Sequence, residues 1–240
     1  AVAEASEAFE TFNLDLMYAL PGQTLPELEA DIATALSFKP PHLSIYHLTI
    51  EPNTLFAKHP PTGAHALPDD DSAFDMLDRI TQRTEAAGLS RYEVSAFAQP
   101  AHRCAHNLNY WQFGDYLGIG AGAHGKLTQV TKSAPMIIRT TKTRVPKDYL
   151  RASAADFRVS TTTITPRELP FEFMLNTLRL IDGVPAALWP ERTGLSADIL
   201  SATVIALQAK GLLQTEPGQL AATALGQRYL NRVIEAFLPE

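Results

Sequence analysis

One short segment combines side chains that suit a flat, metal-containing ligand. It reads His106-Asn107-Leu-Asn-Tyr110-Trp111. On a helix, His106 and Tyr110 share one face, and Asn107 and Trp111 share the adjacent face. Imidazole is a common ligand of heme iron, and large amphipathic rings stack on porphyrins. The residues alone leave two readings open: a heme surface with His106 as axial ligand, or a helix N-terminus anchored in the core by its aromatic rings.

A second candidate is Asp15, which interrupts an apolar run at 13–19 that reads as a buried strand. Burying an ionised carboxylate is costly unless it is paired. We therefore expect Asp15 to be either a structural acceptor or a ligand group near the open end of a parallel sheet. All seven histidines lie within the first 124 residues, so any chemistry is expected in the first part of the chain.

A glycine-rich segment at 120–125 matches the pattern Gly-x-Gly-x-x-Gly. Residues 126–133 are poor helix formers, and position 145, where a dinucleotide fold would need an acidic residue, is Val145. We therefore reject a dinucleotide-binding fold. A glycine-rich strand end that lets a ligand approach the backbone is the remaining expectation.

Basic residues and a single cysteine complete the candidates. Arg139, Lys142 and Arg144 lie on a predicted strand, which would either grip carboxylates such as porphyrin propionates or form a solvated edge strand. Cys104 is either a thiolate ligand beside His106 or an inert packed side chain. One cysteine excludes an internal disulfide, a four-cysteine zinc site and a self-contained iron–sulfur cluster.

The elements that position these residues begin with a strand–helix–strand unit. The strands are expected at 13–19 and 42–50, and the helix between them begins at a capping box formed by Thr24 and Glu27. Such a unit predicts an α/β fold with a parallel sheet buried on both faces. Further elements are expected at 69–87 (helix), 91–98 (strand), 137–144 (strand) and from 145 onward (helix).

A Thr- and Pro-rich stretch at 158–170 predicts a domain boundary, with domains at 1–157 and 158–240. Three helices, a hairpin at 212–223 and a final helix then follow in the order of a winged helix. Between Arg167 and Glu240 there are six basic and eight acidic residues. DNA affinity depends on phosphate contacts, so we expect a packing or interaction module and no nucleic-acid binding.

Composition sets the outer limits. The chain has 240 residues, 45% of them hydrophobic and 19% charged, and a net charge of −6, which is typical of a globular protein. No stretch approaches the roughly 20 apolar residues of a membrane span, and no signal peptide opens the chain, so a cytoplasmic location is expected. Residue 1 is Ala, and 1–11 reads as the middle of a helix, so a fragment of a longer chain is expected.

Four segments together carry a resemblance to a known family. They are 12–23 (FNLDLMYALPGQ), 41–56 (PHLSIYHLTIEPNTLF), 106–111 (HNLNYW) and 118–125 (GIGAGAHG). On these segments the chain resembles the HemW branch of the HemN-like radical S-adenosylmethionine (SAM) proteins, over essentially its whole length. Arg139-Thr-Thr-Lys142 and 169–173 also fit.

The resemblance implies a fold and two competing activities. The fold would be the C-terminal part of an incomplete (β/α) barrel followed by a small, winged-helix-like HemN C-terminal domain. The favoured activity is a heme chaperone that passes heme to an acceptor protein. The alternatives are an oxygen-independent coproporphyrinogen III oxidase and a winged-helix interaction module.

The resemblance also implies site residues. Asp15 matches a SAM-contacting aspartate, Thr49 and His124 fall near SAM, and the segment from His106 to Trp111 matches a heme-binding motif. The Cys-x₃-Cys-x₂-Cys motif that would hold a [4Fe–4S] cluster is absent. SAM and cluster binding are thus expected of a longer parent, and this chain should be inactive alone. A missing N-terminal half or an oligomer partner is expected to cover the cut barrel edge.

Overall fold

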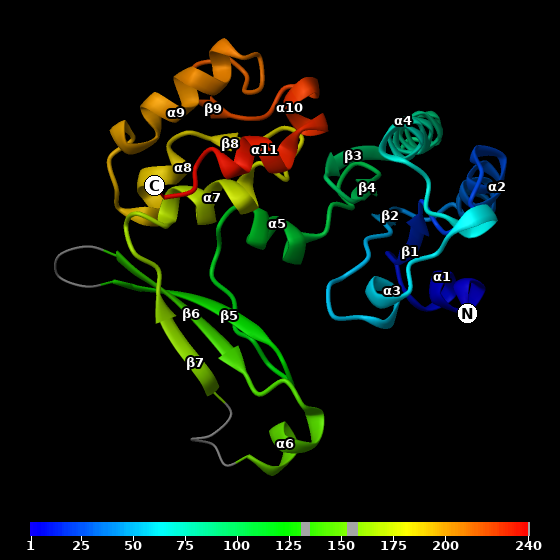
Figure 1. Ribbon diagram of the computed structural model, residues 1–240, viewed down its shortest axis with the longest axis horizontal. Helices are drawn as coiled ribbons and strands as arrows, with labels where there is room; N and C mark the ends of the chain where they lie inside the picture. The colour runs from blue at the N-terminus through cyan, green and yellow to red at the C-terminus, as the bar shows by residue number, and fades with distance from the viewer. Residues whose placement is uncertain (131–134, 153–157, 240) are drawn as a thin grey trace. The chain divides into compact units, whose positions relative to one another are not determined.

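The computed structural model describes residues 1–130, 135–152 and 158–239. They form two compact units, Ala1–Arg103 and Cys104–Glu240 (Figure 1). Each unit contains its own cluster of buried hydrophobic side chains. The predicted boundary between 157 and 158 adjoins a segment, 153–157, that lies outside the described residues, and it stays a prediction.

The first unit is built on a four-stranded sheet in the order β1-β2-β4-β3. β1 runs parallel to β2, with Asn13 opposite His42 and Tyr18 opposite His47, which confirms the predicted strand–helix–strand unit. β4 is antiparallel to both β2 and β3, so the sheet is mixed. The elements are α1 (Val2–Ala8), β1 (Asn13–Tyr18), α2 (Leu25–Ser37), β2 (His42–His47), α3 (Leu55–Lys58), η1 (Gly63–His65), α4 (Asp70–Ala86), β3 (Ser90–Glu93) and β4 (Ala96–Ala98).

The prediction of one strand at 91–98 is wrong, because the chain reverses there. Residues 94 and 95 form a turn that joins β3 to β4 as an antiparallel hairpin. The Arg91 guanidinium donates a hydrogen bond of 2.7 Å to the Val94 carbonyl and helps to close this turn. No Gly, Pro or Asn marks the reversal, so the sequence lacks the usual turn signal.

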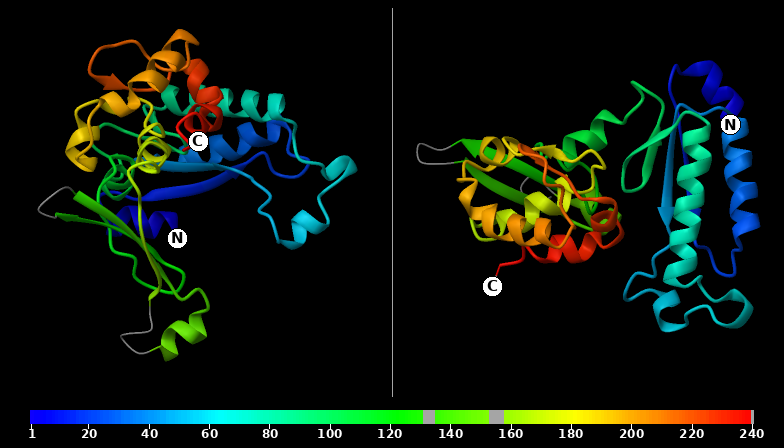
Figure 2. Two further views of the ribbon diagram at one scale, coloured as in Figure 1. Left: turned by 60° about the vertical axis from the view of Figure 1, so that its left-hand side comes forward. Right: turned by 90° about the horizontal axis from the view of Figure 1, so that it is seen from above.

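Two capped helices cover one face of this sheet. α2 begins at the predicted capping box, in which the Thr24 amide donates to the Glu27 carboxylate (2.8 Å) and the Thr24 hydroxyl accepts from the Glu27 amide. α4 begins at Asp69, whose carboxylate accepts from the Ser72 amide (2.8 Å). The helices lie side by side (Figure 2). Their buried side chains pack with those of the strands in one cluster.

The second unit combines a three-stranded antiparallel sheet, β5-β6-β7, with a helical domain. A small β8-β9 pair lies among the helices. The predicted strand at 137–144 corresponds to β6, whereas β5 and β7 were not expected as strands. The elements are α5 (Ala105–Trp111), β5 (His124–Val130), β6 (Pro135–Lys142), α6 (Pro146–Arg151), β7 (Arg158–Thr163), α7 (Leu169–Thr177), β8 (Val184–Pro185), α8 (Leu188–Thr193), α9 (Asp198–Ala209), β9 (Gln219–Leu220), α10 (Ala224–Arg228) and α11 (Leu230–Glu235).

Large aromatic side chains lie within the hydrophobic core of this unit. Phe173 of α7 and Trp189 of α8 are fully buried, with ring centroids 5.3 Å apart. The predicted hairpin at 212–223 is reduced to one bridge, Leu213 with Ala222, because β9 pairs with β8 instead. The helices α7, α8 and α9 follow in the predicted order, whereas the predicted single final helix is divided at Tyr229 into α10 and α11. The winged-helix assignment stays a prediction.

Candidate functional site

The segment of the His106 motif forms α5, a short helix that packs against α7 (Figure 1). Phe113, two residues after the end of the helix, adopts a left-handed backbone (φ 56°) and is buried. A bulky residue is rarely found in this conformation, which costs of order 1–3 kcal/mol. Gly114 follows, and a Cβ there would overlap Asn109. The end of α5 is therefore held in one tightly constrained conformation.

His106 and Tyr110 come together on α5, as their spacing predicts. Their ring centroids are 4.5 Å apart and their planes meet at 78°. Tyr110 in turn contacts Tyr116, with centroids 4.4 Å apart and planes at 89°. The imidazole of His106 is on an exposed residue, whereas both tyrosines are half-buried. An accessible imidazole thus stands at the end of a row of perpendicular rings, an arrangement favoured by aromatic quadrupoles.

Asn107 and Trp111 occupy the adjacent face, where both are half-buried. Trp111 packs against the helical core, and the Arg179 guanidinium carbon lies 4.3 Å from the centroid of its ring. Its indole Nε1 is buried, and no acceptor for it lies among the described residues. Trp111 therefore has the core on one side and a cation over its ring. This position is consistent with a helix anchored in the core as well as with a ring that stacks on a ligand.

A buried lysine fixes the loop after α5. Lys126 of β5 is 2% exposed, and its ammonium donates to the Phe113 carbonyl (3.0 Å) and to the Asp115 carboxylate (2.9 Å). Burial lowers the pKa of Lys126, and Asp115 opposes that change. Partial burial acts to raise the pKa of Asp115, but hydrogen bonds from Lys126 and Thr128 hold it below its ordinary value. Sequence analysis missed this pair, because a lysine on a strand normally signals an exposed edge.

The Arg139 side chain has protein partners and is only partly exposed to solvent. β6 is the central strand of its sheet, so the edge-strand reading is wrong. One guanidinium nitrogen donates to the Tyr116 hydroxyl (2.6 Å), and the other pairs with the Glu172 carboxylate of α7 (2.5 Å). Lys142 and Arg144 remain for the predicted contact with carboxylates; Lys142 is half-buried and Arg144 exposed.

The residues predicted for SAM divide between the units. Asp15 lies on β1 and Thr49 just after β2, in the first unit, whereas His124 begins β5 in the second. All three are exposed. The expected burial of Asp15 is therefore wrong, because strand alternation turns it to the face opposite the one that α2 and α4 cover. Its carboxylate accepts a hydrogen bond of 2.8 Å from Asn13.

A histidine that the sequence did not single out lies behind Asp15. His42 of β2 is buried; its Nδ1 is 2.6 Å from the Asn13 carboxamide oxygen, and its Nε2 is 2.9 Å from the Tyr92 hydroxyl. Burial lowers the pKa of His42, while the Asp15 charge acts to raise it. Since the Asn13 oxygen can only accept, His42 donates through Nδ1 and accepts at Nε2. The chain from Tyr92 through His42 and Asn13 ends on the Asp15 carboxylate.

The segment at 120–125 does not open a helix. It leads directly into β5, as the poor helix formers after it predict. Within the described ranges, no group of three or more His, Cys, Asp or Glu side chains lies close enough to hold a metal ion. Cys104 is half-buried and stands just before α5. These residues do not fit an iron–sulfur cluster by themselves.

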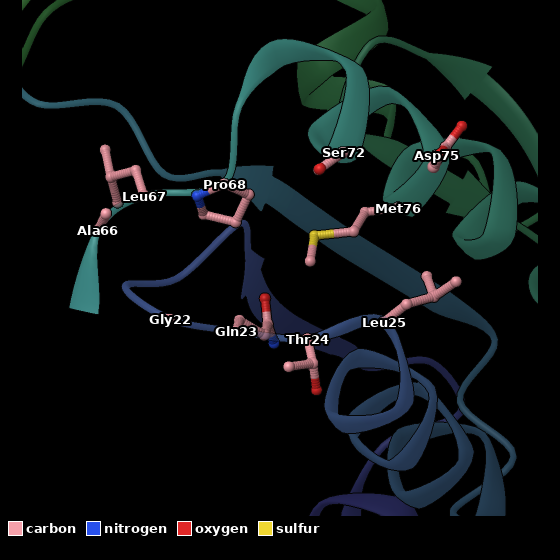
Figure 3. Close-up of a pocket in the computed structure, with 10 residues that line it drawn as sticks. All are labelled: Gly22, Gln23, Thr24, Leu25, Ala66, Leu67, Pro68, Ser72, Asp75 and Met76. Carbon is pink, nitrogen blue, oxygen red and sulfur yellow. The ribbon is translucent and has the colours of Figure 1, made fainter. Parts of the chain in front are cut away.

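A separate pocket of about 310 Å³ lies between the beginnings of α2 and α4 (Figure 3). It contains none of the residues predicted for a site. The residues around the pocket are Gly22, Gln23, Thr24, Leu25, Ala66, Leu67, Pro68, Ser72, Asp75 and Met76.

No helix in the part of the chain that the structure describes is both long and apolar enough to span a bilayer.

Comparison with known proteins supports the resemblance. Residues 164–229 match the family described as HemN C-terminal domain. The chain is 43% identical over 230 residues to the heme chaperone HemW of Escherichia coli, covering 96% of this chain and 58% of that protein. The chain is thus similar to HemW over nearly its whole length. It is also 36% identical to HemW of Bacillus subtilis, over 97% of this chain and 60% of that protein.

The HemW-like chain spans about three-fifths of the length of these curated relatives. Its fold matches that of coproporphyrinogen III oxidase (HemN) from Escherichia coli, a radical SAM enzyme, with a TM-score of 0.74. That match covers 98% of this chain and 57% of the other, at 17% identity. The predicted fold class, the C-terminal part of a radical SAM-type barrel followed by a HemN C-terminal domain, is confirmed.

Proposed function

We propose that this chain is the heme-binding portion of a HemW-like heme chaperone, which passes heme to an acceptor protein. The observation that carries the proposal is the exposed imidazole of His106, which meets the Tyr110 ring edge-to-face, with centroids 4.5 Å apart, on a helix of constrained geometry. Several relatives over nearly the whole chain bear the name heme chaperone. A carrier must release its cargo, and an accessible surface ligand suits release better than an enclosed pocket does.

Each residue of the motif would have a distinct part. His106 would ligate the iron, because a neutral imidazole offers a nitrogen lone pair. Tyr110 would present an aromatic wall beside the ligand. Trp111 would contribute the part of its ring that the core leaves accessible, and Asn107 would orient a propionate or the imidazole by hydrogen bonding.

SAM binding would belong to the longer protein of which this chain matches a part. Asp15 would receive a cationic or hydroxyl group of SAM, since its carboxylate is exposed and steadied by Asn13. The SAM contacts predicted for Thr49 and His124 rest on the family resemblance alone. A single cysteine cannot supply the three thiolates of a [4Fe–4S] cluster. We therefore assign no step that runs through the cluster to this chain.

Heme titration followed by absorbance tests the proposal. The chain should show a saturable Soret shift near one heme per chain, and His106→Ala should lose it. His59→Ala is the matched control: it removes another exposed histidine, just after α3, and should titrate like the parent. Equal binding by His106→Ala and the parent, or no binding by the parent, would contradict the proposal.

A further inference from the structure

A continuous set of contacts joins the HemN C-terminal domain to the exposed imidazole. Glu172, on α7 within that domain, pairs with Arg139 on β6, and Arg139 donates to the Tyr116 hydroxyl at 2.6 Å. The Arg139 and Glu172 side chains are 27% and 24% exposed. Charge-assisted hydrogen bonds in a partly desolvated setting are short and directional. The Tyr116 ring is therefore held at its hydroxyl end.

The held ring supports two others in turn. Tyr116 meets Tyr110 at 89°, and Tyr110 meets His106 at 78°. Edge-to-face contacts restrict the rotation of both rings. His106 is exposed on a seven-residue helix, so neighbouring core atoms do little to restrict it. Its orientation depends on Tyr110, and that of Tyr110 depends on Tyr116.

The charges of the sheet show why Arg139 needs a partner of its own. Lys126 and Arg139 are directly opposed on β5 and β6, so their side chains share one face of the sheet. Like charges in that position destabilise a sheet. Asp115 neutralises Lys126, and Glu172 neutralises Arg139. Without Glu172, the repulsion would act on the guanidinium that holds Tyr116.

We infer that Glu172, Arg139 and Tyr116 are positioning residues for heme binding: by clamping Tyr116 they orient Tyr110 and preset the His106 imidazole for the iron. This inference rests on the proposed function and deepens it. None of the three needs to touch heme. Their contribution is preorganisation, because side chains already ordered in the free protein lose less entropy on binding.

The variants that test this inference are Glu172→Gln, which removes the negative charge that pairs with Arg139, and Tyr116→Phe, which keeps the ring but removes the hydroxyl. Each should weaken heme binding by about three- to tenfold, the effect of freeing one or two side-chain rotations. The double variant should be no weaker than the weaker single one, since both changes break the same chain of contacts. Glu235→Gln, which breaks the exposed pair with Arg232 (2.9 Å), is the matched control and should leave affinity unchanged.

A second measurement needs no heme. The ring protons of His106 in the nuclear magnetic resonance spectrum of the free protein are assigned by their loss in His106→Ala. The Tyr110 ring current should displace them, and Glu172→Gln should move them towards the positions of an unrestrained histidine. Glu235→Gln should not move them.

The outcomes separate this inference from the proposed function. If the parent binds heme through His106 but both variants bind equally well, or their effects add, the positioning role is wrong. If the His106 protons do not move in Glu172→Gln, it is also wrong. If the parent fails to bind heme while those protons still move, the contacts from Glu172 to His106 exist. The proposed heme function is then wrong, and so is the inference that these contacts serve heme binding.

Discussion

At the scale of single residues, the two partners of the Lys126–Asp115 pair differ in burial, so we expect their removal to cost different amounts of stability. The lysine is almost fully buried, whereas the Asp115 side chain is 40% exposed. Asp115→Ala should cost about 2–4 kcal/mol in the free energy of unfolding, because it leaves a buried ammonium with fewer partners. Lys126→Met should cost only about 1 kcal/mol, because Asp115 can turn to water. Urea denaturation of both variants measures the difference, and equal costs would contradict this account.

The same pair predicts a dependence on pH. Burial lowers the pKa of Lys126, so between that lowered value and the ordinary value of about 10.4 the unfolded chain binds more protons than the folded one. Stability contributed by this group therefore rises with pH in that window. Asp115→Ala removes the carboxylate that opposes the lowering of the Lys126 pKa. The free energy of unfolding of this variant should therefore rise more steeply with pH than that of the parent, and the difference between the two should shrink between pH 7 and pH 10. The deficit of Lys126→Met should not shrink in this way.

At the scale of elements, α5 depends on the sharp turn that ends it. Gly114→Ala would drive a Cβ into the side chain and backbone of Asn109. We expect a loss of about 1–3 kcal/mol in stability, together with weaker heme binding, because the end of α5 must shift. Gly211→Ala is the control: Gly211 has φ +69° but open space around it, so strain of about 1 kcal/mol is expected and heme binding should be retained.

Capping signals and alternation explain which elements could be predicted. The Thr24–Glu27 box marks α2 at its first residue, and the apolar run at 13–19 marks β1. β7 was not expected because 158–163 is rich in threonine and has no apolar period. The reversal at 94–95 was missed because Val94 favours strands and Ser95 alone is a weaker turn signal than Gly, Pro, Asn or Asp. Elements marked by neighbouring residues could be predicted from the sequence, whereas those that depend on pairing with distant strands could not.

At the scale of the whole molecule, the two clusters of buried side chains predict two separable unfolding events. Both tryptophans, Trp111 and Trp189, belong to the second unit, so their fluorescence reports on that unit. Leu43 is fully buried in the first. Leu43→Ala should destabilise the first unit by about 2–5 kcal/mol and shift part of the circular dichroism transition. The fluorescence transition should stay where it is in the parent, and an equal shift of both would show one cooperative unit.

The sequence by itself carried the family resemblance in its motifs. It also determined the strand–helix–strand unit and the side-by-side placement of His106 and Tyr110, because these two features follow from periodicity and short spacing. Only the tertiary structure decided what lies against them. It placed Asp15 on an exposed face, turned Arg139 from a free cation into the clamp of Tyr116, and buried Lys126 with Asp115. The environments of Arg139 and Lys126 depend on partners 11 to 33 residues away, which spacing along one strand or helix does not specify.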